Sequence, residues 1–210
     1  MEKLLSCIVP FLDSRVLIDN LFANAEKFPT SIEIILVHDS IIPLDERVLG
    51  DLRERIPCDL IYLSGDFGSA GTARNAGLEI ATGKWISFWD SDDEVLMAGI
   101  EELIQSSEDY EVILGAFKVK RSDSDTEPRI YLPSRMNLVA FPGIWRFIFK
   151  HALIGDNRFN ELKLGEDICF LMDIDAVNSK RKVVKEPFYI YKLDRKSTRL
   201  NSSHANISYA

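Results

Sequence analysis

Short apolar runs alternate with amphipathic stretches over the first 120 residues of the chain. The runs have the length of buried strands, and the predicted strands are residues 4–9, 32–37, 59–63, 84–89 and 111–119. Between them apolar residues recur at helical spacing, and the predicted helices are residues 14–27, 44–55, 72–81 and 94–106. Four β–α repeats with short connections predict an α/β fold, with a mostly parallel sheet covered by helices on both faces.

The pattern is less regular in the second half of the chain. A polar stretch at residues 120–128 predicts a hairpin or loop, and a longer loop is predicted at residues 133–142, with a short strand at 130–132 between them. The later predicted elements are an aromatic-rich helix at residues 144–153, a helix at 166–177, and one or two closing strands at 182–192. Because the sequence contains no internal repeat or linker, residues 1–193 are expected to form one domain.

Residues 194–210 are polar and show no periodicity. From Asp194 to His204 they match, in frame, the translation of a DNA-sequencing adapter, and the two codons that follow would be a sample barcode. We therefore expect a non-native tail after position 193, joined to a native chain that was cut near Leu193.

Composition narrows the class of protein. The chain has 210 residues, of which 46% are hydrophobic and 28% charged, as in ordinary globular proteins. Its net charge of −8 argues against nucleic acid as a partner. The three cysteines lie far apart in apolar runs and are expected to be buried, reduced thiols of a cytoplasmic protein. The sequence has no apolar stretch of about 18 residues and no secretory signal, and loose attachment to the inner face of a membrane stays open.

An acidic cluster follows the predicted strand at residues 84–89. Asp90, Asp92 and Asp93 lie within four positions, and like charges this close require a cation or a set of hydrogen-bond donors. Carboxylate oxygens favour Mg²⁺ or Mn²⁺, while a solvated acidic turn that caps a helix near Glu94 is the alternative. Asp39 also follows a strand. Since ligands bind beyond the carboxyl ends of parallel strands, we expect Asp39 and the acidic cluster to converge at one edge of the sheet.

Five short motifs occur in a specific order along the chain. They are Cys7-Ile-Val-Pro-Phe11, Glu33-Ile-Ile-Leu-Val-His-Asp39, Ala73-Arg-Asn-Ala-Gly77, Trp89-Asp-Ser-Asp-Asp93 and Gly165-Glu-Asp167. Together they resemble the inverting glycosyltransferases of the GT-A fold, with the closest likeness to the large bacterial glycosyltransferase family 2, which builds surface polysaccharides. The resemblance covers about residues 3–192 and implies a GT-A fold with a Rossmann-like, mostly parallel central sheet.

The resemblance implies a nucleotide site in the first half of the chain. By analogy with the family, Pro10 and Phe11 would line the base pocket, Asp39 would accept a hydrogen bond from the base, and Arg74 would lie near the nucleotide. The sequence departs from the family pattern at His38, where relatives usually carry a second aspartate, and it lacks the glycine that usually precedes the residue equivalent to Ser40.

The resemblance also implies the residues around the reacting groups. Asp90, Ser91 and Asp92 match the D-x-D motif, with Asp92 nearest a Mn²⁺ or Mg²⁺ ion and Asp90 nearer the ribose or sugar. Asp167 matches the catalytic base, although a carboxylate at a helix start also suits the helix dipole. The acceptor side would include three residues, Trp145, Arg146 and Glu166.

The implied function is metal-dependent, inverting transfer of a sugar from a nucleoside diphosphate sugar, with a UDP-sugar favoured. The acceptor would be a glycan or a lipid-linked glycan. One alternative is a non-catalytic module that binds nucleotide sugars. A sugar-phosphate nucleotidyltransferase is a second alternative, but that class needs a glycine- and arginine-rich loop where this chain has Pro10-Phe-Leu-Asp13. A haloacid-dehalogenase phosphatase would place its D-x-D pair after the first strand rather than the fourth.

Overall fold

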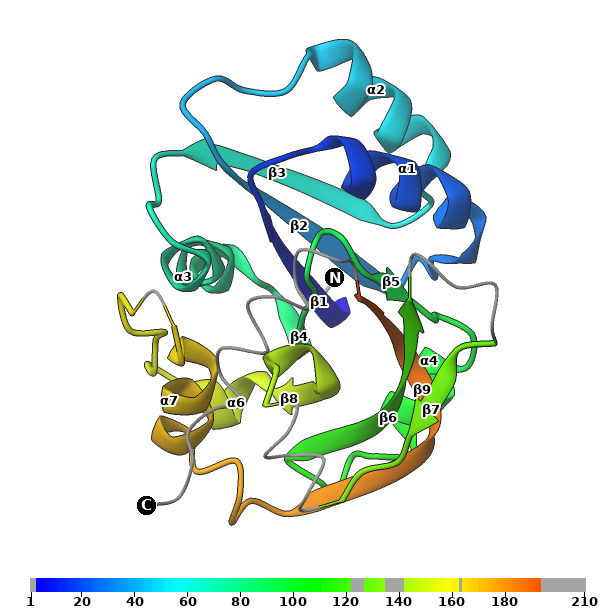
Figure 1. The fold of residues 1–210 in the computed structure, drawn as a ribbon, viewed down its shortest axis with the longest axis vertical. Helices are drawn as coiled ribbons and strands as arrows, with labels where there is room; N and C mark the ends of the chain where they lie inside the picture. The colour runs from blue at the N-terminus through cyan, green and yellow to red at the C-terminus, as the bar shows by residue number, and fades with distance from the viewer. Residues whose placement is uncertain (1–2, 122–126, 135–141, 163, 194–210) are drawn as a thin grey trace.

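The computed structural model describes residues 3–121, 127–134, 142–162 and 164–193 of the chain (Figure 1). Within these ranges the strands form one sheet in the order β3-β2-β1-β4-β8-β6-β9-β5, and β7 pairs with β6 at the side of this path. The predicted tail and parts of the two predicted loops fall outside the described residues.

The first half of the chain builds a four-stranded parallel sheet whose strands are joined by three helical connections. Its strands are β1 (Lys3–Phe11), β2 (Ile32–Asp39), β3 (Asp59–Gly65) and β4 (Gly83–Phe88). They pair in parallel as β3-β2-β1-β4. The connecting helices are α1 (Arg15–Asn24), followed by a 3-10 turn (Ala25–Lys27), α2 (Glu46–Arg55) and α3 (Ala70–Ile80). This half confirms the predicted α/β class.

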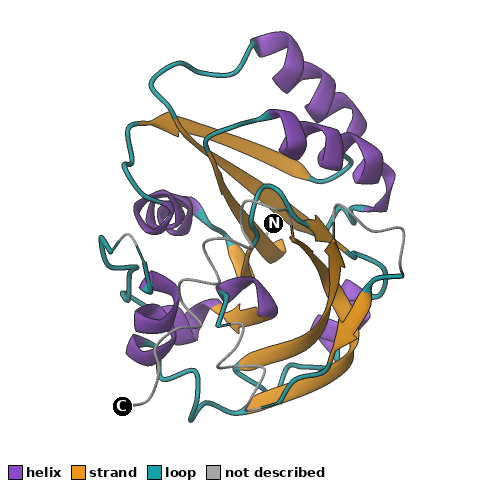
Figure 2. Ribbon diagram, in the orientation of Figure 1, coloured by secondary structure: helices purple, strands orange, loops and turns teal. Residues whose placement is uncertain are grey.

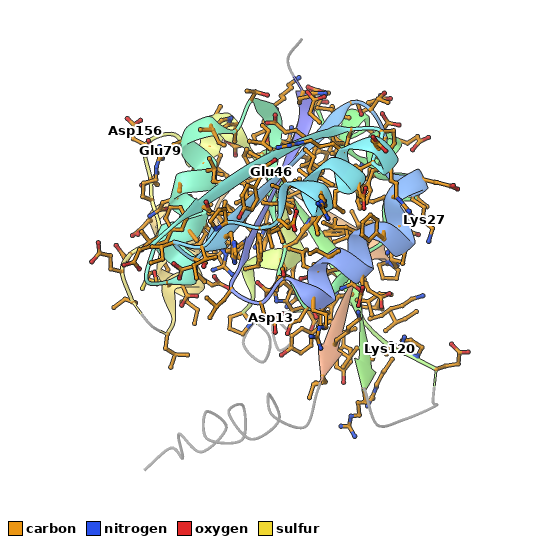
Figure 3. All side chains as sticks on the ribbon, turned by 90° about the horizontal axis from the view of Figure 1, so that it is seen from above. Asp13, Lys27, Glu46, Glu79, Lys120 and Asp156 are labelled. Carbon is orange, nitrogen blue, oxygen red and sulfur yellow. The ribbon has the colours of Figure 1, made fainter. Side chains whose placement is uncertain are left out.

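Helices cover the sheet on both faces. The side chains of α1 and α2 pack with one set of strand residues, including Leu36, and those of α3 and α7 pack with the other set, including Ile35. Successive strand residues point to opposite faces, and both faces of β1 and β2 are buried. Figure 2 shows the helices flanking the strands, and in Figure 3 charged side chains such as Lys27, Lys120 and Asp156 lie at the periphery.

The second half adds strands that pair in both directions. These are β5 (Glu94–Val95), β6 (Val112–Arg121), β7 (Arg129–Tyr131), β8 (Phe147–Lys150) and β9 (Arg181–Leu193). The helical segments are α4 (Ile100–Gln105), a 3-10 turn (Ile144–Arg146), α6 (His151–Ile154) and α7 (Glu166–Asp173). The β8 strand runs antiparallel to β4 and β6, whereas β9 runs parallel to β6. The long β6–β9 pair curls under the first half, as Figure 1 shows.

The structure corrects two predicted helices. The helix predicted at residues 94–106 begins only at Ile100, after Gly99 in the left-handed region at φ 76°. Its first two predicted residues instead form β5, which pairs with β9. The helix predicted at 144–153 is a 3-10 turn, the strand β8 and the short helix α6. An unbroken apolar run fits a buried strand as well as a helix, and pairing with β4 and β6 decides for the strand.

The remaining predicted elements are present with shifted ends. The single closing strand β9 spans the region predicted for one or two strands.

Cys7 and Cys58 are buried free thiols, as predicted, and the third, Cys169, is a half-buried free thiol. Across the described part of the chain, no helix combines the length and apolar character needed to span a bilayer.

Candidate active site

Arg74 gathers three carboxylates at the carboxyl edge of the parallel sheet. Its Nη2 donates to Asp90 Oδ1 at 3.0 Å, and its Nη1 donates to Asp167 Oδ1 at 3.0 Å and to Glu166 Oε1 at 3.4 Å. These side chains come from α3, from the end of β4 and from the first turn of α7. Two residues predicted for the donor side, Arg74 and Asp90, therefore share one cluster with the predicted base Asp167 and with Glu166.

The fold places Arg74 by fixing the start and the packing of α3. The helix begins at a Ser69 cap whose hydroxyl accepts a hydrogen bond from Thr72 N at 3.1 Å. Gly77 lets the helix approach β1 closely, since an added Cβ would lie 2.5 Å from Ile8 Cγ2. On this helix Arg74 is 4% exposed, with its guanidinium 5.3 Å from the centre of the Phe159 ring. The side chain is therefore held by packing as well as by its ion pairs.

Burial and charge oppose each other on Arg74. Burial disfavours its charged form, but the carboxylates of Asp167, Asp90 and Glu166 outweigh that effect and raise the pKa of Arg74 above its ordinary value. The guanidinium is therefore always cationic, and it supplies a fixed positive charge to the cluster.

Asp167 has a pKa suited to proton transfer near neutral pH. Burial raises its pKa to about 6, and nearby Asp90 and Glu166 act in the same direction, while Arg74 and a hydrogen bond from Ile144 N oppose them. The two donors bind different oxygens, because Ile144 N lies 2.9 Å from Oδ2 and Arg74 binds Oδ1. The carboxylate is thus oriented from two sides, which a solvated helix cap would not require.

The three aspartates after β4 have different environments. Asp90 is half-buried and paired with Arg74, and its backbone N–H donates to Tyr189 Oη at 3.0 Å. Asp93 is only 5% exposed and accepts a hydrogen bond from Lys192 N at 2.7 Å. Burial, together with the charge of Asp90, raises the pKa of Asp93 to about 8. Asp92 between them is exposed. The turn therefore directs one carboxylate to Arg74, one to the interior and one to the surface.

The donor set at this turn fits a hard divalent cation that also binds a substrate. Among the described residues, no three His, Cys, Asp or Glu side chains are arranged to enclose a metal ion. Mg²⁺, however, is usually held by one or two carboxylates together with substrate phosphates and water. The exposed carboxylate of Asp92, preceded by the half-buried Ser91, fits such an open site. A Mn²⁺ or Mg²⁺ ion at Asp92 stays a prediction.

The residues predicted for the base side lie at the ends of β1 and β2. Phe11 is paired with His38 in the sheet register, and their rings stack with centroids 4.5 Å apart. Asp39 accepts hydrogen bonds from Phe67 N at 2.7 Å and Gly68 N at 3.1 Å, so it also holds the loop after β3. Pro10 is buried beside Phe11. Because β1 separates β2 from β4, Asp39 and the acidic turn share one sheet edge about 10 Å apart.

Of the three residues predicted for the acceptor side, Glu166 belongs to the Arg74 cluster, whereas Trp145 and Arg146 are in the core. Trp145 is 4% exposed and stacks on Tyr189, with ring centroids 4.7 Å apart. Arg146 is 1% exposed, with its guanidinium 4.8 Å from the Phe117 ring centre, and burial lowers its pKa to about 10. Both side chains lie below the surface, and their role toward an acceptor stays a prediction.

Sequence reasoning missed the contribution of β9 to this site. Tyr189 and Lys192 of that strand contact the acidic turn, and Asn20 of α1 joins them through its Nδ2, which lies 2.9 Å from Asp93 O. No local signal marks these residues, because a tyrosine and a lysine in a late apolar strand look like any core or edge residues.

The sequence of this chain is similar to those of known proteins. The sequence model of glycosyl transferase family 2 matches residues 6–179. A β-1,3-glucosyltransferase of Campylobacter jejuni that acts on GalNAc(5)-diNAcBac-PP-undecaprenol is 24% identical over 92% of this chain and 66% of its own length. The poly(ribitol-phosphate) β-N-acetylglucosaminyltransferase TarS of Staphylococcus aureus is 24% identical over 96% of this chain and 37% of its own length.

A solved structure has the same fold. The crystal structure of S. aureus TarS in complex with UDP-GlcNAc superposes with a TM-score of 0.71 at 24% sequence identity, covering 90% of this chain and 58% of that one. The chain therefore spans between 37% and 66% of the length of these proteins.

Proposed function

Because this chain belongs to glycosyl transferase family 2, we propose that it transfers a sugar from a UDP-sugar to a hydroxyl of a glycan or lipid-linked glycan in bacterial surface polysaccharide synthesis. The observation that carries this proposal is the Arg74 cluster, which brings Asp90 after β4 and Asp167 at the start of α7 to one cation. The names of the relatives support the glycan and lipid-linked acceptors, and the UDP-GlcNAc complex of TarS supports the donor.

The donor binds across the carboxyl ends of β1, β2 and β4. The nucleoside base would lie next to Asp39 and the Phe11–His38 stack. The diphosphate and the sugar would lie next to the acidic turn. Asp92, with the phosphate oxygens, would hold the divalent cation. When bound, that cation supplies positive charge that stabilises the leaving diphosphate.

Asp167 acts as the general base. Its carboxylate takes the proton of the acceptor hydroxyl while the hydroxyl oxygen bonds to the anomeric carbon and the bond to the diphosphate breaks on the opposite side of the sugar. A single displacement of this kind inverts the anomeric configuration. With a pKa of about 6, Asp167 is ionised at neutral pH yet more basic than an ordinary aspartate.

Arg74 keeps the base and the donor site in a fixed relationship. It binds Oδ1 of Asp90 and Oδ1 of Asp167 through different nitrogens at 3.0 Å each. Since the guanidinium is planar and rigid, these contacts fix the relative positions of the two carboxylates. That geometry favours the catalytic reading over a module that only binds nucleotide sugars, for which Asp167 would have no task.

Two measurements test the proposal. The first is a thermal-shift screen of UDP-, GDP- and dTDP-sugars with and without Mn²⁺, in which a UDP-sugar with Mn²⁺ should raise the melting temperature most. The second is release of UDP from the donor that binds best. Binding without any release of UDP would support the non-catalytic alternative, and no stabilisation by any nucleotide sugar would refute the proposal.

The base assignment has its own variant. Asp167→Asn retains an oxygen for Arg74 but cannot take a proton, so it should lower UDP release at least about 100-fold while donor affinity changes less than about threefold. Asp173→Asn, at the exposed other end of α7, is the matched control and should behave like the parent. Near-normal turnover in Asp167→Asn would exclude Asp167 as the base.

A further inference from the structure

Two separate routes of contact connect Asp90 to Asp167. The first is the Arg74 ion pair described above. The second begins at Asp167 Oδ2, which accepts from Ile144 N, and passes to the neighbouring Trp145. The Trp145 ring stacks on Tyr189 with an interplanar angle of 12°, and Tyr189 Oη accepts the backbone N–H of Asp90 at 3.0 Å. The two routes together form a closed loop of contacts, which runs from Asp90 through Arg74 to Asp167 and returns through Tyr189.

Tyr189, which links Trp145 to Asp90 in the second route, is fixed in place by burial and by strand pairing. Its side chain is fully buried, and its backbone lies opposite Phe117 of β6 and Val95 of β5, so both neighbouring strands fix its position. Burial, and after it the nearby carboxylates of Asp90 and Asp93, raise the pKa of the Tyr189 hydroxyl well above its ordinary value. The hydroxyl is therefore neutral at any working pH.

β9 anchors the acidic turn at both of its ends. Tyr189 binds the turn before Asp92, through Asp90 N, and Lys192 N binds it after Asp92, through Asp93 Oδ1 at 2.7 Å. The Lys192 ammonium also binds Glu94 Oε1 at 2.9 Å. The exposed Asp92 thus sits in a short segment that one strand holds on either side.

From this geometry we propose that Tyr189 is a positioning residue for the donor site: its hydroxyl fixes the backbone of Asp90, and thereby directs Asp90 toward Arg74 and Asp92 toward the bound diphosphate. This inference rests on the proposed function for the identity of the ligand. It assigns a role to a side chain that touches neither donor nor acceptor. It also gives the buried Trp145 a supporting role, since its indole stacks on the tyrosine ring.

The test removes the hydroxyl and keeps the ring. Tyr189→Phe retains the stack on Trp145, so the fold should persist. The matched control is Tyr110→Phe, at a half-buried tyrosine that contacts Lys180 and precedes the start of β6. We expect the dissociation constant of UDP in the presence of Mn²⁺ to rise about tenfold in Tyr189→Phe. The dissociation constant of UDP without Mn²⁺ should change less than twofold, and Tyr110→Phe should match the parent in both.

Amide hydrogen exchange provides a readout that needs no ligand. In Tyr189→Phe the Asp90 amide should exchange at least about ten times faster, while the Trp89 amide, which donates to Ile8 O at 3.0 Å, should keep its rate. An unchanged Asp90 amide would overturn the inference. A faster amide with a UDP–Mn²⁺ affinity within twofold of the parent would overturn it as well.

The two proposals fail in distinguishable ways. If the parent protein binds no nucleotide with Mn²⁺, the proposed function is refuted, and the exchange rate of the Asp90 amide still decides whether Tyr189 positions the turn. If the parent binds UDP with Mn²⁺ and Tyr189→Phe binds it equally well, the proposed function survives and the positioning role is refuted. A purely structural role would lower the melting temperature without altering the Mn²⁺-dependent part of the affinity.

Discussion

Arg74 Nη1 lies 3.0 Å from Asp167 Oδ1, joining two residues that are 93 positions apart in the sequence. The same guanidinium reaches Asp90 through its other terminal nitrogen. Such a shared cation orients both carboxylates, and its charge acts to lower the pKa of Asp167. The pKa of Asp167 therefore depends on the positive charge of Arg74.

The first prediction concerns the pH dependence of UDP release. Asp167 must be ionised to accept a proton, and its pKa is about 6. The rate should therefore be constant above about pH 7 and fall as the pH drops through about 6, by about tenfold per pH unit at lower pH. The measurement is kcat/KM for the best donor between pH 5 and 8. A rate unaffected down to pH 5 would contradict the assignment of Asp167.

The second prediction concerns Arg74→Gln. Arg74 lowers the pKa of Asp167, so removing its charge should raise that pKa and move the acidic limb of the rate profile about 1–3 units to higher pH. The rate at pH 7 should fall for the same reason. Arg158→Gln is the control, because Arg158 is only half-buried and its contact with Glu79 is long at 3.8 Å. An acidic limb at the same pH in both variants would show that the coupling is weak.

The third prediction concerns the stability of Asp93→Asn. The Asp93 carboxyl has a raised pKa of about 8 in the folded protein, whereas an unfolded aspartate titrates near 3.9. The folded state therefore binds an extra proton between these values, and the contribution of Asp93 to stability falls as the pH rises from about 4 to about 8. Asn keeps the acceptor for Lys192 N and carries no charge.

The stability difference between Asp93→Asn and the parent should thus grow with pH. The difference should be smallest at pH 5 and largest at pH 8, where the variant should melt about 3 °C or more above the parent. Melting curves at pH 5, 6.5 and 8 provide the measurement. A difference that does not vary with pH would mean that Asp93 is ionised across the whole range.

The fourth prediction compares two helical glycines. A Cβ at Gly77 would lie 2.5 Å from Ile8 Cγ2, so Gly77→Ala should push α3 off β1 and destabilise the protein by about 1–3 kcal/mol. A Cβ at Gly50 of α2 meets nothing within 4 Å, so Gly50→Ala should be stabilising by about 0.5–1 kcal/mol through helix propensity. Chemical denaturation of both variants tests this. A neutral Gly77→Ala would mean that α3 is free to shift.

One part of the candidate active site could be predicted from the sequence, and another part could not. That Asp39 and the acidic turn end parallel strands could be predicted locally, because an apolar run that stops at carboxylates marks the end of a buried strand. That Arg74 binds Asp90, Glu166 and Asp167 could not, because these partners are 16, 92 and 93 residues away. The burial of Trp145 and Arg146 could not be predicted locally either, since it depends on β6 and β9 packing over them.

The sequence by itself determined the alternation of strands and helices in the first half, the strand ends that carry the aspartates, and the motifs that mark the family. Only the tertiary structure decided that residues 147–150 form a strand and that residues 94 and 95 pair with β9. It also decided that a tyrosine of the last strand holds the acidic turn. The physical reason is that hydrophobic periodicity records whether a segment is buried, whereas strand order and hydrogen-bond partners are set by which distant segments cover it.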